Sequence, residues 1–241
     1  MKRHVPATLH NHWTAKALIS ALLILFSASL FSASLAAQGV PGAQGDIVRE
    51  LMPNDAPPQA LRLTPAEKGQ AVKRLEAAQK QATGKRAQEI AFLLATLGSN
   101  YSKNRDYLVR ALHGCYHATA KSNCDEETSE FLEALYKSGH DELLPALLAA
   151  WVTDQAALLE LLGGFYSNVL TEKPAQFLDS IQSFPMATQK SICALAGSTD
   201  GSGMAPETLQ QARKQLKAIG SAVALRCLRQ VEKANVHRPA D

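Results

Sequence analysis

The spacing of apolar residues after Thr64 is the feature that most constrains this chain. From there to about residue 234 they recur at intervals of three and four, and sustained period-two alternation rich in Val, Ile and Thr is missing. The pattern predicts an all-α fold in a single helical domain over residues 64–238. The expected helices cover residues 64–82, 85–97, 106–113, 125–137, 142–152, 155–170, 175–184, 187–196 and 206–234.

The first of these helices has a strong local start signal. Thr64 can act as the N-cap, Pro65 stands at the first helical position, and Glu67 follows three residues after the cap. This combination predicts a capping box and fixes the expected start of the helical domain.

Short connections between the expected helices determine the predicted architecture. Loops such as residues 138–140, 153–154 and 172–174 make consecutive helices antiparallel neighbours. We therefore expect stacked antiparallel helical hairpins in a short irregular solenoid, or a compact helical bundle. In helix pitch, and in the run Asp141–Leu148, the middle of the chain resembles HEAT-type helical repeats, although no residue-level repeat registers.

The N-terminal residues have the composition of an export signal. Basic residues up to Lys16 precede an apolar run from Ala17 to Phe26, and small residues gather at Ser34–Ala37. We interpret residues 1–37 as a secretory signal peptide cleaved after Ala36 or Ala37, which predicts a periplasmic or secreted protein without a stable membrane span. The alternative is an uncleaved membrane anchor over residues 17–37.

The next segment predicts a linker. Residues 38–63 contain four prolines and three glycines, so we expect a Pro/Gly-rich flexible tether with a short turn around residues 47–51. From residue 38 onward, 22 Lys and Arg balance 22 Asp and Glu. This neutrality removes the usual electrostatic argument for a general nucleic-acid-binding protein and for a polybasic membrane-surface protein.

The four cysteines fit an oxidising compartment. All lie after the expected signal, and an even number predicts two disulfides, for which we favour Cys115 with Cys124 and Cys193 with Cys227. The predicted last helix places Cys227 on an apolar stripe, from which it can reach a neighbouring helix that carries Cys193. The alternative is four reduced core thiols.

One cluster of residues suggests a metal site. His113 and His117 are four residues apart and could share a helix face next to Cys115, which is a spacing typical of transition-metal ligands. Gly114 weakens the required helix, and oxidation of Cys115 would remove the sulfur ligand. We favour a disulfide-closed helix end with two solvated histidines, and we expect no metal and no other cofactor.

Two adjacent glycines interrupt the most apolar helix. Gly163 and Gly164 cost the helix roughly 1 kcal/mol each relative to alanine, so something must compensate. Close crossing by another helix is the favoured explanation. The alternative is a small apolar ligand pocket near Gly163, Phe165 and Tyr166.

These observations predict a class of function but no reaction. The sequence contains no nucleophile elbow, zinc-protease helix or dinucleotide-binding glycine loop. The leading hypothesis is an exported, non-enzymatic binding or scaffold protein that contacts another protein or a cell-envelope component. The alternatives are a carrier for a small apolar ligand and a cell-wall hydrolase with an unrecognised carboxylate pair.

Overall fold

The chain is helical throughout the part that the structure describes. The computed structural model describes residues 45–54, 57–58, 61–117, 127–151, 156–199 and 201–235. Every regular element within these ranges is a helix and none is a strand, which confirms the predicted all-α fold. The expected signal peptide lies outside the described residues and stays a prediction. No described helix has the length and apolar character required to cross a membrane.

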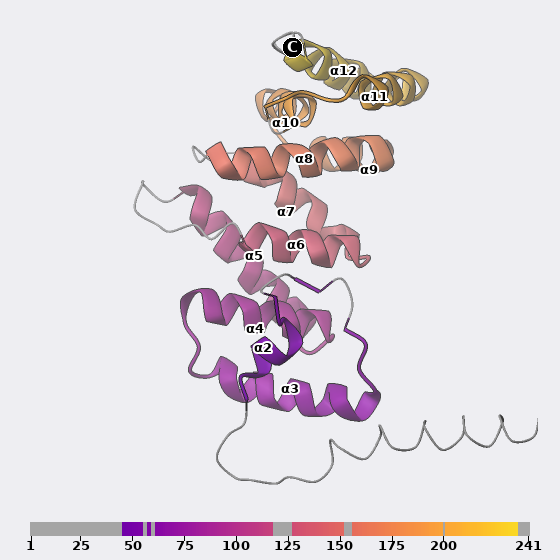
Figure 1. The fold of residues 1–241 in the computed structure, drawn as a ribbon. Coiled ribbons are helices and arrows are strands. Elements are labelled where there is room, and N and C mark those ends of the chain that lie inside the picture. Colours follow the sequence, from indigo (N-terminus) through magenta and orange to yellow (C-terminus); the bar gives the residue numbers. More distant parts are fainter. Residues whose placement is uncertain are drawn as a thin grey trace, which may run out of the picture. The chain divides into compact units, whose positions relative to one another are not determined.

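Eleven α-helices and two 3-10 helices follow one another along these residues (Figure 1). In chain order they are α2 (Ile47–Leu51), α3 (Pro65–Gln79), α4 (Gly84–Thr96), α5 (Tyr101–His117), α6 (Glu127–Lys137), η1 (Asp141–Leu143), α7 (Leu144–Leu148), η2 (Ala149–Trp151), α8 (Ala156–Glu172), α9 (Pro174–Ile181), α10 (Met186–Ser198), α11 (Pro206–Ile219) and α12 (Ala222–Asn235).

Part of the segment expected to be a tether belongs to the folded unit, which begins at Gly45. The side chain of Asp46 caps α2, and Ile47, Val48 and Met52 are buried in the core. Glu50 also forms a two-pronged ion pair with Arg74 of α3. The predicted domain boundary at residue 64 is therefore too late, because burial of these apolar side chains compensates for the ordering of a Pro-rich segment.

The start of α3 has the predicted capping box. The Thr64 hydroxyl accepts a hydrogen bond from the Glu67 amide at 3.3 Å, and the Thr64 amide donates to the Glu67 carboxylate at 2.7 Å. Two amides at the helix start, which have no partner within the helix, are thereby satisfied.

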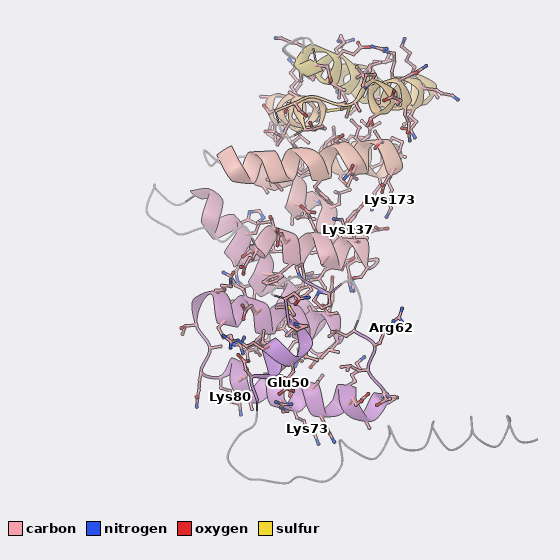
Figure 2. The ribbon with its side chains drawn as sticks, viewed as in Figure 1. Glu50, Arg62, Lys73, Lys80, Lys137 and Lys173 are labelled. Atoms are coloured by element: carbon pink, nitrogen blue, oxygen red, sulfur yellow. A yellow bond between two sulfur atoms is a disulfide. The ribbon has the colours of Figure 1, made fainter. Side chains whose placement is uncertain are left out.

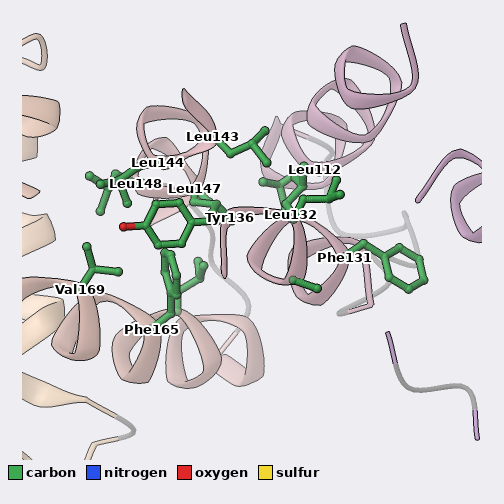
Figure 3. Packing of buried hydrophobic residues seen from close by; sticks show 14 of the residues in the cluster. Leu112, Phe131, Leu132, Tyr136, Leu143, Leu144, Leu147, Leu148, Phe165 and Val169 are labelled. Carbon is green, nitrogen blue, oxygen red and sulfur yellow. The ribbon is translucent and has the colours of Figure 1, made fainter. Parts of the chain in front are cut away.

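The core is continuous along the helices and rich in stacked aromatic rings. Phe92 of α4 stacks on Phe131 of α6 with ring centroids 4.7 Å apart. Tyr136 of α6 meets Phe165 of α8 edge-on, with ring centroids 5.5 Å apart. Figure 3 shows both side chains among the buried residues of the core. These pairs fasten the middle helices to one another.

The contacts between elements are local in the sequence. Each helix packs mainly on helices close to it along the chain, from α2 on α3 and α4 to α10 and α11 on α12. This is the contact pattern of stacked helices, in which the core passes from one helix pair to the next.

The helix expected over residues 142–152 is instead three short pieces, η1, α7 and η2. Pro145 lies in the first turn of α7, where its missing amide proton is tolerated. A continuous helix from residue 142 would bring the proline ring against the carbonyl of Asp141. The chain therefore turns as a 3-10 helix before α7 begins.

The prediction of one long last helix over residues 206–234 is also wrong, because this segment forms two helices, α11 and α12. Gly220 ends α11 in the left-handed conformation, with φ of 65°, and the Ser221 hydroxyl accepts a hydrogen bond from the Ala224 amide at the start of α12. Arg213 and Glu232 pair across the resulting hairpin at 2.7 Å. The single apolar stripe expected there is divided accordingly, and Ile219 is 40% exposed.

Candidate binding groove

A groove lies where the turn between α3 and α4 meets α5. It has a volume of about 540 Å³, which is within the range of small-ligand sites. Figure 2 labels Lys80 at this turn, whereas Lys73 lies farther back along α3. The lining residues are Gln79, Lys80, Ala82, Thr83, Gly84, Ala87, Lys103 and Tyr107.

Small residues in the turn leave the groove open. α3 is capped at Lys80, and α4 begins at Gly84, whose φ of 55° lies in the left-handed region that favours glycine. A Cβ on Gly84 would meet no other residue's atoms within 4 Å. Ala82 and Ala87 line the adjoining wall. The space is thus a consequence of short side chains at a bend in the chain.

A buried asparagine holds α3 against α5 beside the groove. Asn104 is 2% exposed and accepts a hydrogen bond from the Gln79 side chain at 2.8 Å. Its own amide donates to the carbonyl oxygens of Ser99 at 2.9 Å and Asn100 at 3.3 Å. Because these bonds satisfy the amide on both sides, the wall that carries Lys103 and Tyr107 is fixed relative to α3.

The groove is electropositive. Lys80 and Lys103 line it without any carboxylate, and neither lysine has an ion-pair partner among the described residues. By contrast, Lys85 and Arg86 in the first turn of α4 pair with Glu127 and Asp46. The positive end of the α4 dipole adds to the two lysine charges, so this groove suits an anionic group.

A second cluster of polar side chains joins α5 to the turn before α7. The Tyr101 hydroxyl donates to Glu142 at 2.5 Å, and His140 stacks on the Tyr101 ring at 4.2 Å. Burial and the bond to the carboxylate hold the pKa of Tyr101 well above its ordinary value, and the same bond lowers the pKa of Glu142. Both effects favour the protonated phenol, and the bond from Tyr101 to Glu142 ties α5 to the turn before α7.

Glu133 of α6 is a buried carboxyl group. It is 7% exposed, and its Oε2 lies 3.3 Å from Lys137 Nζ. Its Oε1 has no hydrogen-bond partner within the described part of the chain. Burial raises the pKa of Glu133, and the nearby Lys137 offsets only part of that effect. Such a group favours the protonated form more than an exposed glutamate does.

The predicted pocket near Gly163 is occupied by packed protein. A Cβ on Gly163 would lie 1.8 Å from the carbonyl oxygen of Thr199, so α8 and the end of α10 meet with no room for a side chain. Phe165 is 5% exposed and Tyr166 is fully buried, with its hydroxyl donating to the Leu147 carbonyl at 2.6 Å. The contacts support the close-crossing explanation, because the described residues around Gly163, Phe165 and Tyr166 are packed against one another.

The cysteine and histidine predictions have separate outcomes. A disulfide joins Cys193 to Cys227, as expected. His113 lies in α5, which continues through Gly114, whereas the side chains of Cys115 and His117, and all of Cys124, lie outside the described residues. The first disulfide and the metal site therefore stay predictions. Within the described residues, no group of three or more His, Cys, Asp or Glu side chains could hold a metal ion.

Sequence reasoning did not single out the groove residues. Their only local signal is the short turn of small residues before Gly84, together with Lys103 and Tyr107 one helical turn apart in α5. Comparisons with protein-family models, curated proteins and solved structures found no match for this chain.

Proposed function

We propose that this chain is an exported, non-enzymatic binding protein that holds an anionic group of its partner in the groove between α3, α4 and α5. The observation that carries the proposal is a groove of about 540 Å³ whose lining, among the residues that the structure describes, includes two lysines and no carboxylate. Carboxylate-bearing peptides and cell-wall fragments both supply the matching chemistry. The Cys193–Cys227 disulfide supports the expected export, since disulfides persist in oxidising compartments.

The stacked helices support a binding role because they hold the groove on a fixed frame. Gln79 and Asn104 tie α3 to α5, and ion pairs at Lys85 and Arg86 secure the start of α4. A preformed site loses little conformational entropy on binding, so a modest number of charge contacts suffices for useful affinity.

Isothermal titration with two probes tests this function. A hexaglutamate peptide represents an acidic protein segment, and soluble muropeptides represent cell-wall material. The Lys80→Ala/Lys103→Ala variant should bind the preferred probe about fivefold to tenfold more weakly, because each exposed charge contact contributes up to about 1 kcal/mol. The matched control is Lys68→Ala/Lys73→Ala, which removes two exposed lysines of α3 outside the groove.

Each outcome of this titration either supports or contradicts binding of an anionic group in the groove. Saturable binding of one probe that weakens only in the groove variant supports the proposal and identifies the source of the anionic group. Equal weakening in both variants would show that net charge, and not the groove, governs the interaction. Absence of saturable binding to either probe would contradict the proposed function.

The carrier and hydrolase alternatives have their own tests. A ligand that co-purifies in native mass spectrometry would favour the carrier, although the residues expected to hold it are packed core. Release of soluble fragments from cell-wall glycans would favour the hydrolase. Burial raises the pKa of Glu133, which is the direction that a general acid needs. At 7% exposure, however, Glu133 cannot reach a glycan without movement of its surroundings.

A further inference from the structure

The charges of the chain are unevenly distributed despite its formal neutrality after residue 37. Residues 38–185 contain 14 Lys and Arg and 18 Asp and Glu. Residues 186–241 contain eight Lys and Arg but only four Asp and Glu. The segment that includes α10, α11 and α12 is therefore basic, and its partner would be anionic.

Several of these basic side chains are not neutralised within the protein. Arg213 pairs with Glu232. Lys190 of α10, Lys217 of α11 and Arg226 of α12 have no carboxylate partner in the part of the chain that the structure describes. Lys190 and Lys217 are exposed and Arg226 is half-buried, so their charges are available to an external group.

The same segment contains the large apolar side chains that are most exposed. Met186 is 55% exposed, Ile219 is 40% exposed and Leu225 is 39% exposed, and the other described residues include no exposed large hydrophobic side chain. All three belong to the helices that also carry the unpaired bases. Such a combination differs from an ordinary solvated helix face, which carries polar residues alone.

The packing of α10 on α12 brings these residues to one end of the two helices. The Cα atoms of Cys193 and Cys227 are 5.2 Å apart, and a Cβ on Gly197 would lie 2.7 Å from the Cα of Val231. Both pairs are separated by 34 residues, so the helices run parallel in a constant register, and Met186 is level with the turn between α11 and α12.

A small cleft at that end confirms the proximity of two of the bases. Lys190 and Arg226 line it together with Gln189 and Val223, next to the disulfide. We call this group of exposed bases and apolar side chains the cationic corner, and its members are Met186, Lys190, Lys217, Ile219, Leu225 and Arg226.

We propose that the cationic corner docks this protein on the surface of an anionic lipid bilayer. Three separate apolar side chains are too few for the continuous interface of about 800 Å² per partner that a stable protein complex buries. A bilayer surface instead attracts dispersed bases and accepts a few protruding apolar groups at the headgroup level. The disulfide beneath the corner holds α10 to α12, so the side chains are presented on a rigid support. The corner shares no residue with the groove.

Vesicle co-sedimentation of the full exported chain tests this docking. The two probes are vesicles of phosphatidylcholine alone and vesicles of phosphatidylcholine mixed with phosphatidylglycerol. We expect partitioning onto the anionic vesicles that weakens as salt is added, because exposed charges are screened. Equal partitioning onto both kinds of vesicle, or none onto either, would overturn the proposal.

Matched variants separate the corner from net charge. Lys190→Glu/Lys217→Glu should reduce partitioning onto the anionic vesicles by at least about tenfold, since each base near such a surface contributes about fivefold. Lys68→Glu/Lys73→Glu makes the same charge change on exposed lysines of α3 and should reduce it by less than about twofold. Equal losses in the two variants would overturn the proposal, because they would indicate a general charge effect.

Two further measurements complete the test. Met186→Ser/Leu225→Ser should weaken partitioning without changing its salt dependence, because it removes apolar contacts and leaves every charge. Circular dichroism should show the same helix content in all variants, since the altered side chains are exposed. One outcome would be that the natural chain binds hexaglutamate but not anionic vesicles, with the binding lost in Lys190→Glu/Lys217→Glu. In that case the partner is an acidic protein and the membrane proposal is wrong.

Discussion

Small residues do opposite things in two parts of this molecule. At the turn between α3 and α4, Gly84 faces open space and helps to leave a groove. Where α8 meets α10, the missing side chain of Gly163 is replaced by the backbone of Thr199, and Gly197 meets the backbone of α12 in the same way. A glycine or alanine therefore marks either space or contact, and the neighbouring element decides which.

Replacing Gly163 with alanine should produce the largest loss of stability. The new Cβ would overlap the Thr199 carbonyl, so the helices must move apart, and we expect a loss of more than about 3 kcal/mol in the free energy of unfolding. Denaturant unfolding followed by circular dichroism measures this loss.

The adjacent Gly164 provides the matched control. A Cβ there would meet no other residue's atoms within 4 Å, so Gly164→Ala should leave stability unchanged or raise it by up to about 1 kcal/mol through helix propensity. Similar losses in the two variants would show that α8 is not closely crossed at Gly163.

Removal of the Cys193–Cys227 disulfide should have the next largest effect. The bond closes a loop over a sequence separation of 34, and its replacement by two alanines should cost about 2 kcal/mol, near the lower end for disulfides because Gly197 also holds α10 to α12. Melting temperatures of the variant and the natural chain measure the change. We expect a smaller change from Cys115→Ala/Cys124→Ala, and the reverse order would show that the Cys193–Cys227 disulfide is not the more stabilising of the two.

Substitution of Glu133 should change the pH dependence of stability. Burial raises its pKa in the folded protein, so its contribution is fully present below the ordinary value of 4.5 and is lost as the pH rises through the raised value. Glu133→Gln removes that loss and should stabilise the protein by about 1 kcal/mol at neutral pH. Unfolding curves at several pH values provide the measurement, and a variant less stable than the natural chain at neutral pH would contradict burial of the charge.

The smallest effect on stability is expected in the groove. Lys80 and Lys103 have no ion-pair partner among the described residues, so Lys80→Ala/Lys103→Ala should change the free energy of unfolding by less than about 0.5 kcal/mol. A thermal melt measures this change. A loss as large as that expected at Gly163 would mean that the groove residues are structural.

The fold was largely predictable from the sequence, and the failures have local causes. Thr64, Pro65 and Glu67 form a complete start signal, and the capping box is present. The break at Gly220 was missed although a Gly-Ser pair is a recognisable stop and start, because the apolar spacing on either side suggested one helix. The packing of α2 was not predicted, because composition alone does not show that Ile47 and Val48 are buried in the core.

The groove could not be predicted in the same way. Its cationic character depends on Lys103 of α5 lying beside the turn that carries Lys80, and these residues are 23 positions apart in the sequence. It also depends on Asp46 and Glu127 neutralising Arg86 and Lys85 but leaving the two groove lysines unpaired. Only the tertiary arrangement determines which bases are satisfied.

An NMR titration of the isotopically labelled protein with hexaglutamate and, separately, with muropeptides tests anion binding in the groove most directly. Anion binding in the groove predicts saturable shifts of the backbone amides of residues 83–87 and 103–107. Half-saturation of these shifts should need about fivefold to tenfold more ligand in Lys80→Ala/Lys103→Ala, and the same ligand concentration in Lys68→Ala/Lys73→Ala. Shifts confined to other helices, or shifts that saturate at the same ligand concentration in the groove variant as in the natural chain, would contradict the assignment of the binding site.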